Sequence, residues 1–91
     1  MKITAQTNIA TPVFQQIVDQ VHFAISAGEL LPGERLPSIR AVATELSIAP
    51  NTVAKAYRQL EFRGLITAHD RSGYSVLAAA PDSRYQARGV S

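Results

Sequence analysis

The sequence predicts a mainly α-helical domain that ends in a small β-hairpin. Three stretches carry apolar residues at the spacing of one helix face, and after the third the pattern changes to two short strand-like runs around a polar turn. The chain has 91 residues, 46% of them hydrophobic and 18% charged, which is the composition of one folded domain without a second core. We expect an N-terminal arm over residues 1–10, the folded domain over 11–78 and a frayed tail over 79–91.

The first helix is predicted to begin after Thr11 and to end before Gly28. Threonine is a good N-cap, and Pro12 suits the first helical position because an N–H there would have no partner within the helix. Glycine is a common helix terminator. The apolar stripe of this helix, which we expect to be mostly structural, consists of Val13, Phe14, Ile17, Val18, Val21, Ala24 and Ile25.

Two more helices are predicted on either side of a break at residues 47–49. The second follows Ser38, a good N-cap, and the third begins with Pro50 and runs to about Arg63, where Gly64 ends it. The expected buried faces comprise Ile39, Val42, Ala43 and Leu46 in the second helix and Val53, Ala56, Tyr57 and Leu60 in the third.

The hairpin is predicted from strands over residues 65–68 and 74–77, joined by a turn over residues 69–73. Before the second helix, Arg35 and Leu36 could form a very short additional strand. A helix-turn-helix with a wing consists of two helices of similar length, joined by a turn of three or four residues and followed directly by a hairpin. We therefore expect a winged helix-turn-helix fold of three helices plus the wing.

Several function classes find no support in the sequence. The chain has no cysteine for a thiolate metal site, no glycine-rich phosphate loop and no nucleophile elbow. His22 and His69 share no motif, so we expect no catalytic residues, no metal and no cofactor, and hence no enzyme. The sequence also lacks a signal peptide and any apolar run near the roughly 18 residues of a membrane span, so we expect a cytoplasmic protein.

The basic residues gather in the middle of the chain. The formal net charge is only +2, but residues 35–71 hold six basic and three acidic side chains, whereas residues 1–34 carry a net charge of −2. A helix fits the major groove of B-DNA, and asparagine or threonine in its first turn can address base edges or phosphates. The same pattern also describes the solvated face of an ordinary amphipathic helix. The polar face of the third helix, within the basic part, consists of Asn51, Thr52, Lys55, Arg58 and Gln59.

Arg40 strengthens the case for an anionic partner. It lies in the first turn of the second helix, where the helix dipole disfavours a cation by roughly 0.3–1 kcal/mol. A DNA phosphate bound by Ser38, the free N–H groups and Arg40 would remove this conflict. A surface ion pair with Glu45 is the alternative, although five residues is an awkward helical spacing.

The segment 31–40, LPGERLPSIR, resembles the PGxxLPSxR signature of the GntR family of bacterial transcription regulators. The turn, then Asn51-Thr52-Val53 and the segment 60–66, LEFRGLI, follow at the family's spacing, so the resemblance covers most of the chain. The tripeptide Pro50-Asn51-Thr52 and the pair Ala56-Tyr57 further resemble the YtrA-like branch, and less closely the MocR-like branch.

The resemblance implies a transcription regulator, usually a homodimer, that binds a near-palindromic double-stranded DNA operator, and we expect a repressor. By position, the start of the second helix would bind phosphate, the helix over residues 50–63 would enter the major groove, and the wing tip over residues 69–73 would lie beside the minor groove. The candidate DNA-binding residues are Arg35, Ser38, Arg40, Pro50, Asn51, Thr52, Lys55, Arg58, Arg71, Ser72 and Gly73.

The chain departs from the family pattern at several positions. Many members have Ser-Arg in place of Ala49-Pro50 and an arginine in place of Ala54, so two side chains suited to guanine are absent. Ser47 replaces the usual glycine of the turn, which costs up to about 1 kcal/mol if the backbone there is left-handed. In the wing, Arg71 replaces a glycine and Ser75 a usual aromatic residue, which predicts looser packing.

A winged helix that binds another protein instead of DNA is the second hypothesis, because the same fold can present its helix or wing to a protein. Members of the family append an effector or oligomerisation domain after the wing, whereas only residues 78–91 follow it here. We expect the chain to be the DNA-binding part of a longer regulator; the alternative is that it dimerises weakly through the first helix and the tail. No effector can be inferred from it.

Overall fold

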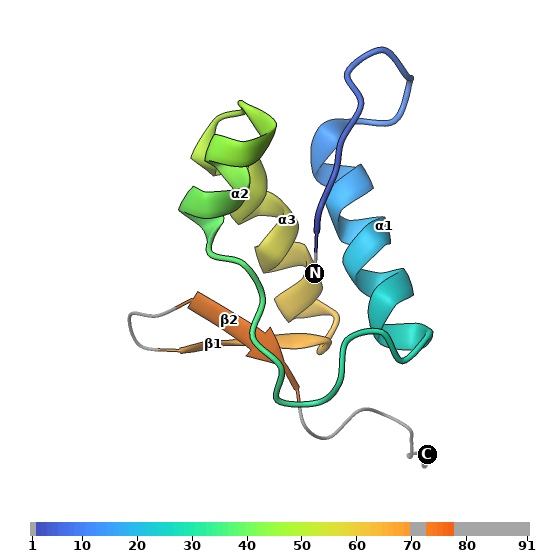
Figure 1. Cartoon of the computed structure of the whole chain (residues 1–91), viewed down its shortest axis with the longest axis vertical. Coiled ribbons are helices and arrows are strands. Elements are labelled where there is room, and N and C mark those ends of the chain that lie inside the picture. Colours follow the sequence, from blue (N-terminus) through green and yellow to red (C-terminus); the bar gives the residue numbers. More distant parts are fainter. Residues whose placement is uncertain (1, 70–72, 78–91) are drawn as a thin grey trace.

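The computed structural model describes residues 2–69 and 73–77, which form three helices and a two-stranded antiparallel sheet (Figure 1). The predicted winged helix-turn-helix fold, mainly α with a small hairpin, is confirmed. None of the helices in these two stretches is long and apolar enough to cross a membrane. In chain order the elements are α1 (Val13–Ser26), α2 (Ile39–Leu46), α3 (Pro50–Phe62), β1 (Ile66–His69) and β2 (Gly73–Val76).

The central element is α3, which packs against α1, α2 and β1, and the hairpin lies across the lower ends of α2 and α3 in the view of Figure 1. Tyr57, in the middle of α3, is fully buried. Its ring meets that of Tyr74 in β2 edge to face, with ring centroids 5.0 Å apart. The other buried apolar side chains are Ile3, Ile17, Val18, Val21, Ala24, Leu30, Leu36, Val42, Ala43, Val53, Ala56, Leu60, Ile66 and Val76.

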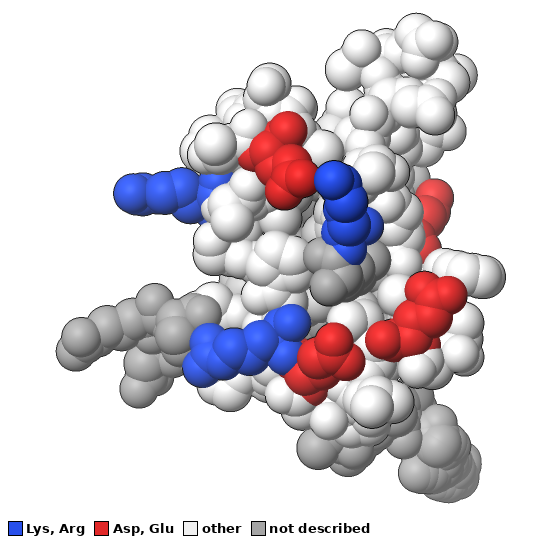
Figure 2. All heavy atoms as spheres, viewed as in Figure 1, with Lys and Arg blue, Asp and Glu red and all other residues white. Residues whose placement is uncertain are grey.

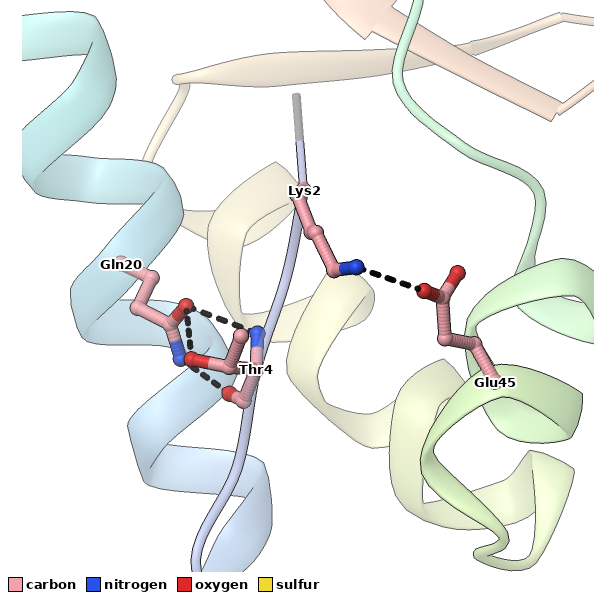
Figure 3. Close-up of polar contacts among 4 residues, drawn as sticks. All are labelled: Lys2, Thr4, Gln20 and Glu45. Atoms are coloured by element: carbon pink, nitrogen blue, oxygen red, sulfur yellow. Dashed lines mark hydrogen bonds and ion pairs between the residues drawn. The ribbon is translucent and has the colours of Figure 1, made fainter.

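Residues 2–6, here called the N-terminal strap, run along α1 and are held there through their main chain. The Gln20 side chain forms hydrogen bonds to both the N–H and the C=O of Thr4 (Figure 3). One turn earlier, Gln16 does the same for Gln6, accepting from its N–H at 2.8 Å and donating to its C=O at 2.7 Å. Two glutamines four residues apart on one helix therefore bind alternate residues of an extended segment.

The strap also contributes to the core and reaches α2. Ile3 is only 4% exposed, although the sequence pattern did not assign it to the core. The Lys2 ammonium lies 3.5 Å from the Glu45 carboxylate of α2, so the strap connects the first helix to the second (Figure 3).

All three helices end in the same hydrogen-bond pattern, in which a residue with a left-handed backbone and the residue after it donate their N–H groups to carbonyls near the end of the helix. Gly28 after α1 and Gly64 after α3 adopt the left-handed backbone that this pattern requires, with φ of 79° and 78°. After α2 the corresponding residue is Ser47, with φ 57° and ψ 46°, and the Ile48 N–H bonds the Ala43 carbonyl at 3.0 Å. The serine therefore has a steric cost that the two glycines avoid.

The predicted start of α1 is wrong by one residue. The helix begins at Val13, because Pro12 has an extended backbone with ψ 150° and lies outside it. The Pro12 carbonyl accepts the N–H groups of Gln15 and Gln16, at 3.1 Å each, and no side chain caps the helix. Thr11 is therefore not the N-cap.

The predicted hairpin turn is too long by one residue on each side. His69 and Gly73, which were assigned to the turn, are the last paired residues of the two strands, opposite each other in a register that begins with Ile66 and Val76. Of the short strand expected over Arg35 and Leu36, the structure forms an isolated antiparallel bridge between Arg35 and Ser75.

Replacing Ser47 with glycine is expected to raise the free energy of unfolding by up to about 1 kcal/mol, because glycine takes the left-handed backbone without a Cβ clash. Denaturant unfolding followed by circular dichroism measures the change. Ser26→Gly is the matched control, because Ser26 is the last residue of α1 and has a right-handed helical backbone. This substitution should lower the same free energy by roughly 0.5–1 kcal/mol. Equal stability of wild type and S47G would show that the turn carries no strain.

Candidate nucleic-acid interface

The N-terminus of α2 is the first part of the candidate interface. Ser38 is its N-cap as predicted, and the Ser38 hydroxyl oxygen accepts a hydrogen bond from the Ala41 N–H at 3.0 Å. Within the described residues, the N–H groups of Ile39 and Arg40 form no hydrogen bond. They remain available to an anion at the positive end of the helix dipole.

Arg40 is exposed in the first turn of α2. Glu45 pairs with Lys2 instead, and no carboxylate in the part of the chain that the structure describes lies within ion-pair distance of Arg40. The alternative interpretation, a surface ion pair between Arg40 and Glu45, is therefore wrong. No acid within the described residues offsets the unfavourable interaction between the Arg40 charge and the helix dipole. Arg40 therefore remains suited to binding an anion from outside the domain.

The start of α2 is held in place by α3. The Tyr57 hydroxyl donates a hydrogen bond of 2.6 Å to the carbonyl of Pro37, the residue before the N-cap. Burial, and in second place the nearby Tyr74, raises the pKa of Tyr57, so the hydroxyl keeps its proton and remains a donor. The bond fixes the cap of α2 relative to the helix that carries the exposed polar face.

The outward face of α3 carries a single polar stripe. Asn51, Lys55 and Arg58 are exposed and follow one another at intervals of four and three residues, so they share one side of the helix. The buried residues of α3, among them Val53 and Tyr57, lie on the opposite side. The prediction that this side faces outward is confirmed, except that Thr52 is half-buried.

The first turn of α3 has few capping contacts. Pro50 occupies the first helical position, as predicted, and Ala49 offers no side-chain cap. Thr52 is half-buried, and its N–H bonds the Ala49 carbonyl at 3.0 Å. Proline needs no partner there because it has no N–H, and the Asn51 N–H forms no hydrogen bond within the described residues.

Lys55 is held against α1. Its ammonium nitrogen lies 4.1 Å from the ring centroid of Phe14, in the first turn of α1. The sequence pattern placed Phe14 in the apolar stripe and gave it no part in the interface. The contact depends on how two helices pack, and no spacing within either helix encodes it.

The wing is described only in part. Gly73 begins β2 with φ 101°, while Arg71 and Ser72 lie outside the described residues. At the base of the tip, the side chain of buried Ser75 shares a hydrogen bond of 2.6 Å with the His69 ring. Arg35 is exposed beside this strand, to which its backbone is bridged.

The structure thus places the described candidate residues on three elements. Figure 2 shows basic side chains reaching out at the edge near α2 and the hairpin, and acidic side chains both at the opposite edge, over α1, and close to the basic side chains on the same face. The three groups are Ser38 and Arg40 at the start of α2, Pro50, Asn51, Thr52, Lys55 and Arg58 on α3, and Arg35 and Gly73 at the hairpin.

A family model described as bacterial regulatory proteins, gntR family, matches residues 14–76. The chain belongs to the GntR family. It is 45% identical over 62 residues to the HTH-type transcriptional regulator Rv1152 of Mycobacterium tuberculosis and 42% identical over 66 residues to the HTH-type transcriptional repressor YtrA of Bacillus subtilis. These matches cover 68% and 71% of this chain.

A solved structure of YtrA from Sulfolobus acidocaldarius, a GntR-family transcription factor, superposes with a TM-score of 0.75 at 41% identity, over 82% of this chain and 79% of that one. The expected resemblance to the YtrA-like branch is confirmed. The family is one of regulatory proteins and not of enzymes, as expected. The chain spans about half the length, 51%, of both curated relatives.

Replacing Ser38 with alanine should lower the free energy of unfolding by roughly 0.5–2 kcal/mol, because the Ala41 N–H loses its partner at the start of α2. Thermal and denaturant unfolding measure the loss. Ser38→Asn, which retains a capping oxygen, should stay close to wild type. If S38N were as destabilised as S38A, the capping bond would not be the cause.

Proposed function

We propose that this chain binds a specific double-stranded DNA operator and represses transcription, with α3 in the major groove and the hairpin turn beside the minor groove. The observation that carries the proposal is the outward stripe of α3, Asn51, Lys55 and Arg58, together with the α2 start, where Arg40 has no internal acid among the described residues. A helix N-terminus with free N–H groups and an arginine suits a phosphate, and the stripe suits a groove.

Membership of a family of bacterial regulatory proteins supports the DNA partner, and the repressor YtrA of Bacillus subtilis supports the direction of control. We propose that the domain acts in the cytoplasm, and that it binds as a homodimer, because two-fold related half-sites are the usual target of helix-turn-helix domains. On this proposal Ser38 and Arg40 contact phosphate, Asn51 and Thr52 contact base edges or phosphate, and Arg71 and Ser72 belong to the wing contact.

Selection of bound sequences from a random DNA pool, followed by affinity measurement on the selected duplex, tests the proposal. The double variant Arg40→Ala with Lys55→Ala should weaken binding about a hundredfold or more, because each charged contact contributes about 1.5–3 kcal/mol. It should also reduce the salt slope, d log K/d log[salt], by about 2. Arg63→Ala removes one charge at the other end of α3 and serves as the control, with affinity close to wild type.

Recovery of no preferred sequence would contradict the proposal, and so would full affinity of the double variant. The hypothesis of a protein-interaction winged helix predicts binding that hardly changes between low and moderate salt, whereas a contact to several phosphates weakens steeply over the same range. The salt titration therefore separates the two functions in one experiment.

A further inference from the structure

α1 packs along the length of α3 (Figure 1). Lys55 of α3 meets Phe14 of α1, and the Arg63 guanidinium lies 3.3 Å from the His22 ring nitrogen Nδ1. Both pairs are 41 positions apart in the sequence. The two helices therefore run in the same direction, and the two contacts are separated by eight residues, or about 12 Å, along each helix.

Of these two contacts, the one at Lys55 involves a residue of the candidate interface. The Phe14 ring is half-buried and packed against the core, whereas the Lys55 side chain is exposed. The ammonium thus rests 4.1 Å from the centroid of an aromatic ring while it keeps contact with water. A lysine side chain by itself is a point charge on a flexible stem, so the ring restricts where this charge is found.

The charge of Lys55 is not used inside the described part of the chain. No carboxylate there lies within ion-pair distance of its ammonium. The acidic residue of the neighbouring turn of α1, Asp19, accepts a hydrogen bond of 2.8 Å from Gln15 instead. An aromatic ring orients the cation without neutralising it, and this leaves the full charge available to an anion outside the domain.

The side of α3 on which the ammonium is held decides which DNA group it can meet. A helix about 10–12 Å wide fills a major groove about 12 Å wide, so side chains in the middle of its outward stripe face base edges and those at its margins face the phosphates that border the groove. The Phe14 ring draws Lys55 to the margin that faces α1. No hydrogen bond, ion pair or ring contact joins Asn51 or Arg58 to α1 among the described residues.

We propose that Phe14 is a positioning residue that holds Lys55 at the α1 margin of α3, where the ammonium contacts a DNA phosphate and not a base edge. The inference rests on the proposed DNA-binding function and deepens it: α1 takes part in the interface through this ring. Lys55 then contributes affinity and salt dependence, and no sequence preference.

A double-mutant cycle tests the proposal, with Phe14→Leu, Lys55→Ala and both together, on the duplex selected by wild type and on duplexes with single base changes. Lys55→Ala should reduce the salt slope by about 1 and weaken all duplexes by the same factor. Phe14→Leu should weaken binding about two- to fivefold in the wild-type background and should have no further effect once Lys55 is alanine. Thermal unfolding shows whether each variant is folded at the assay temperature.

Two results would overturn the proposal: an equal loss from Phe14→Leu in both backgrounds, which is the signature of a general packing defect, or a Lys55→Ala effect confined to one base position.

A measurement without DNA separates this failure from that of the proposed function. In the NMR spectrum of the full chain, the resonances of the protons on Lys55 Cε should be shifted upfield by the Phe14 ring. They should return toward ordinary values in F14L. If wild type shows that shift but binds no DNA, the positioning contact stands and both functional proposals fail; if the shift is absent, only the positioning proposal fails.

Discussion

Tyr57 lies fully buried in the middle of α3, yet it ends in a hydroxyl that must find a partner inside the domain. The partner is the Pro37 carbonyl, 2.6 Å away and one residue before the cap of α2. The ring of the same side chain meets Tyr74 of β2 edge to face. One buried side chain therefore joins the helix that carries the polar stripe, the start of α2 and the hairpin, so the parts of the candidate interface are positioned by the core.

The contacts of the N-terminal strap differ in how much they contribute to the free energy that holds it in place. The Lys2–Glu45 ion pair is exposed, with 77% and 57% of the two side chains accessible, and such pairs contribute about 0–1 kcal/mol. Burial of an isoleucine such as Ile3 contributes about 1.5–3 kcal/mol. The strap is therefore held by Ile3 and by the hydrogen bonds from Gln16 and Gln20, and the ion pair follows from where the strap lies.

The elements of this fold could be predicted because each has a local signal. Ser38 before α2, Pro50 at the start of α3 and the glycines after α1 and α3 fix helix ends through backbone chemistry that acts within a few residues. The errors arose where a local signal had a competitor. Thr11 has a capping side chain, but the Pro12 carbonyl receives the helical N–H groups instead.

The contacts between elements had no such signal. The sequence predicts an N-terminal arm over residues 1–10, and no spacing in it marks Ile3 as buried. Likewise, Phe14 belongs to the predicted apolar stripe, and its contact with Lys55 arises only once α1 and α3 pack in register. Candidate phosphate-binding residues at α2 could be found from sequence, whereas the orientation of a lysine on α3 required the packed structure.

On the proposed DNA-binding mode, the chemistry of α3 limits how it can choose a sequence. Pro50 and Ala54 offer no hydrogen-bond donor from their side chains, so neither position can supply the bidentate arginine contact that guanine favours. Asn51 is the exposed side chain of the first turn that can bond an adenine through two hydrogen bonds. Arg40 on α2 and Lys55 at the α1 margin supply charge without base discrimination. With few side chains on α3 that can contact bases, the phosphate contacts must fix where the helix sits along the groove, and discrimination then depends on Asn51, Thr52 and Arg58 and on the shape of the DNA that these contacts accept.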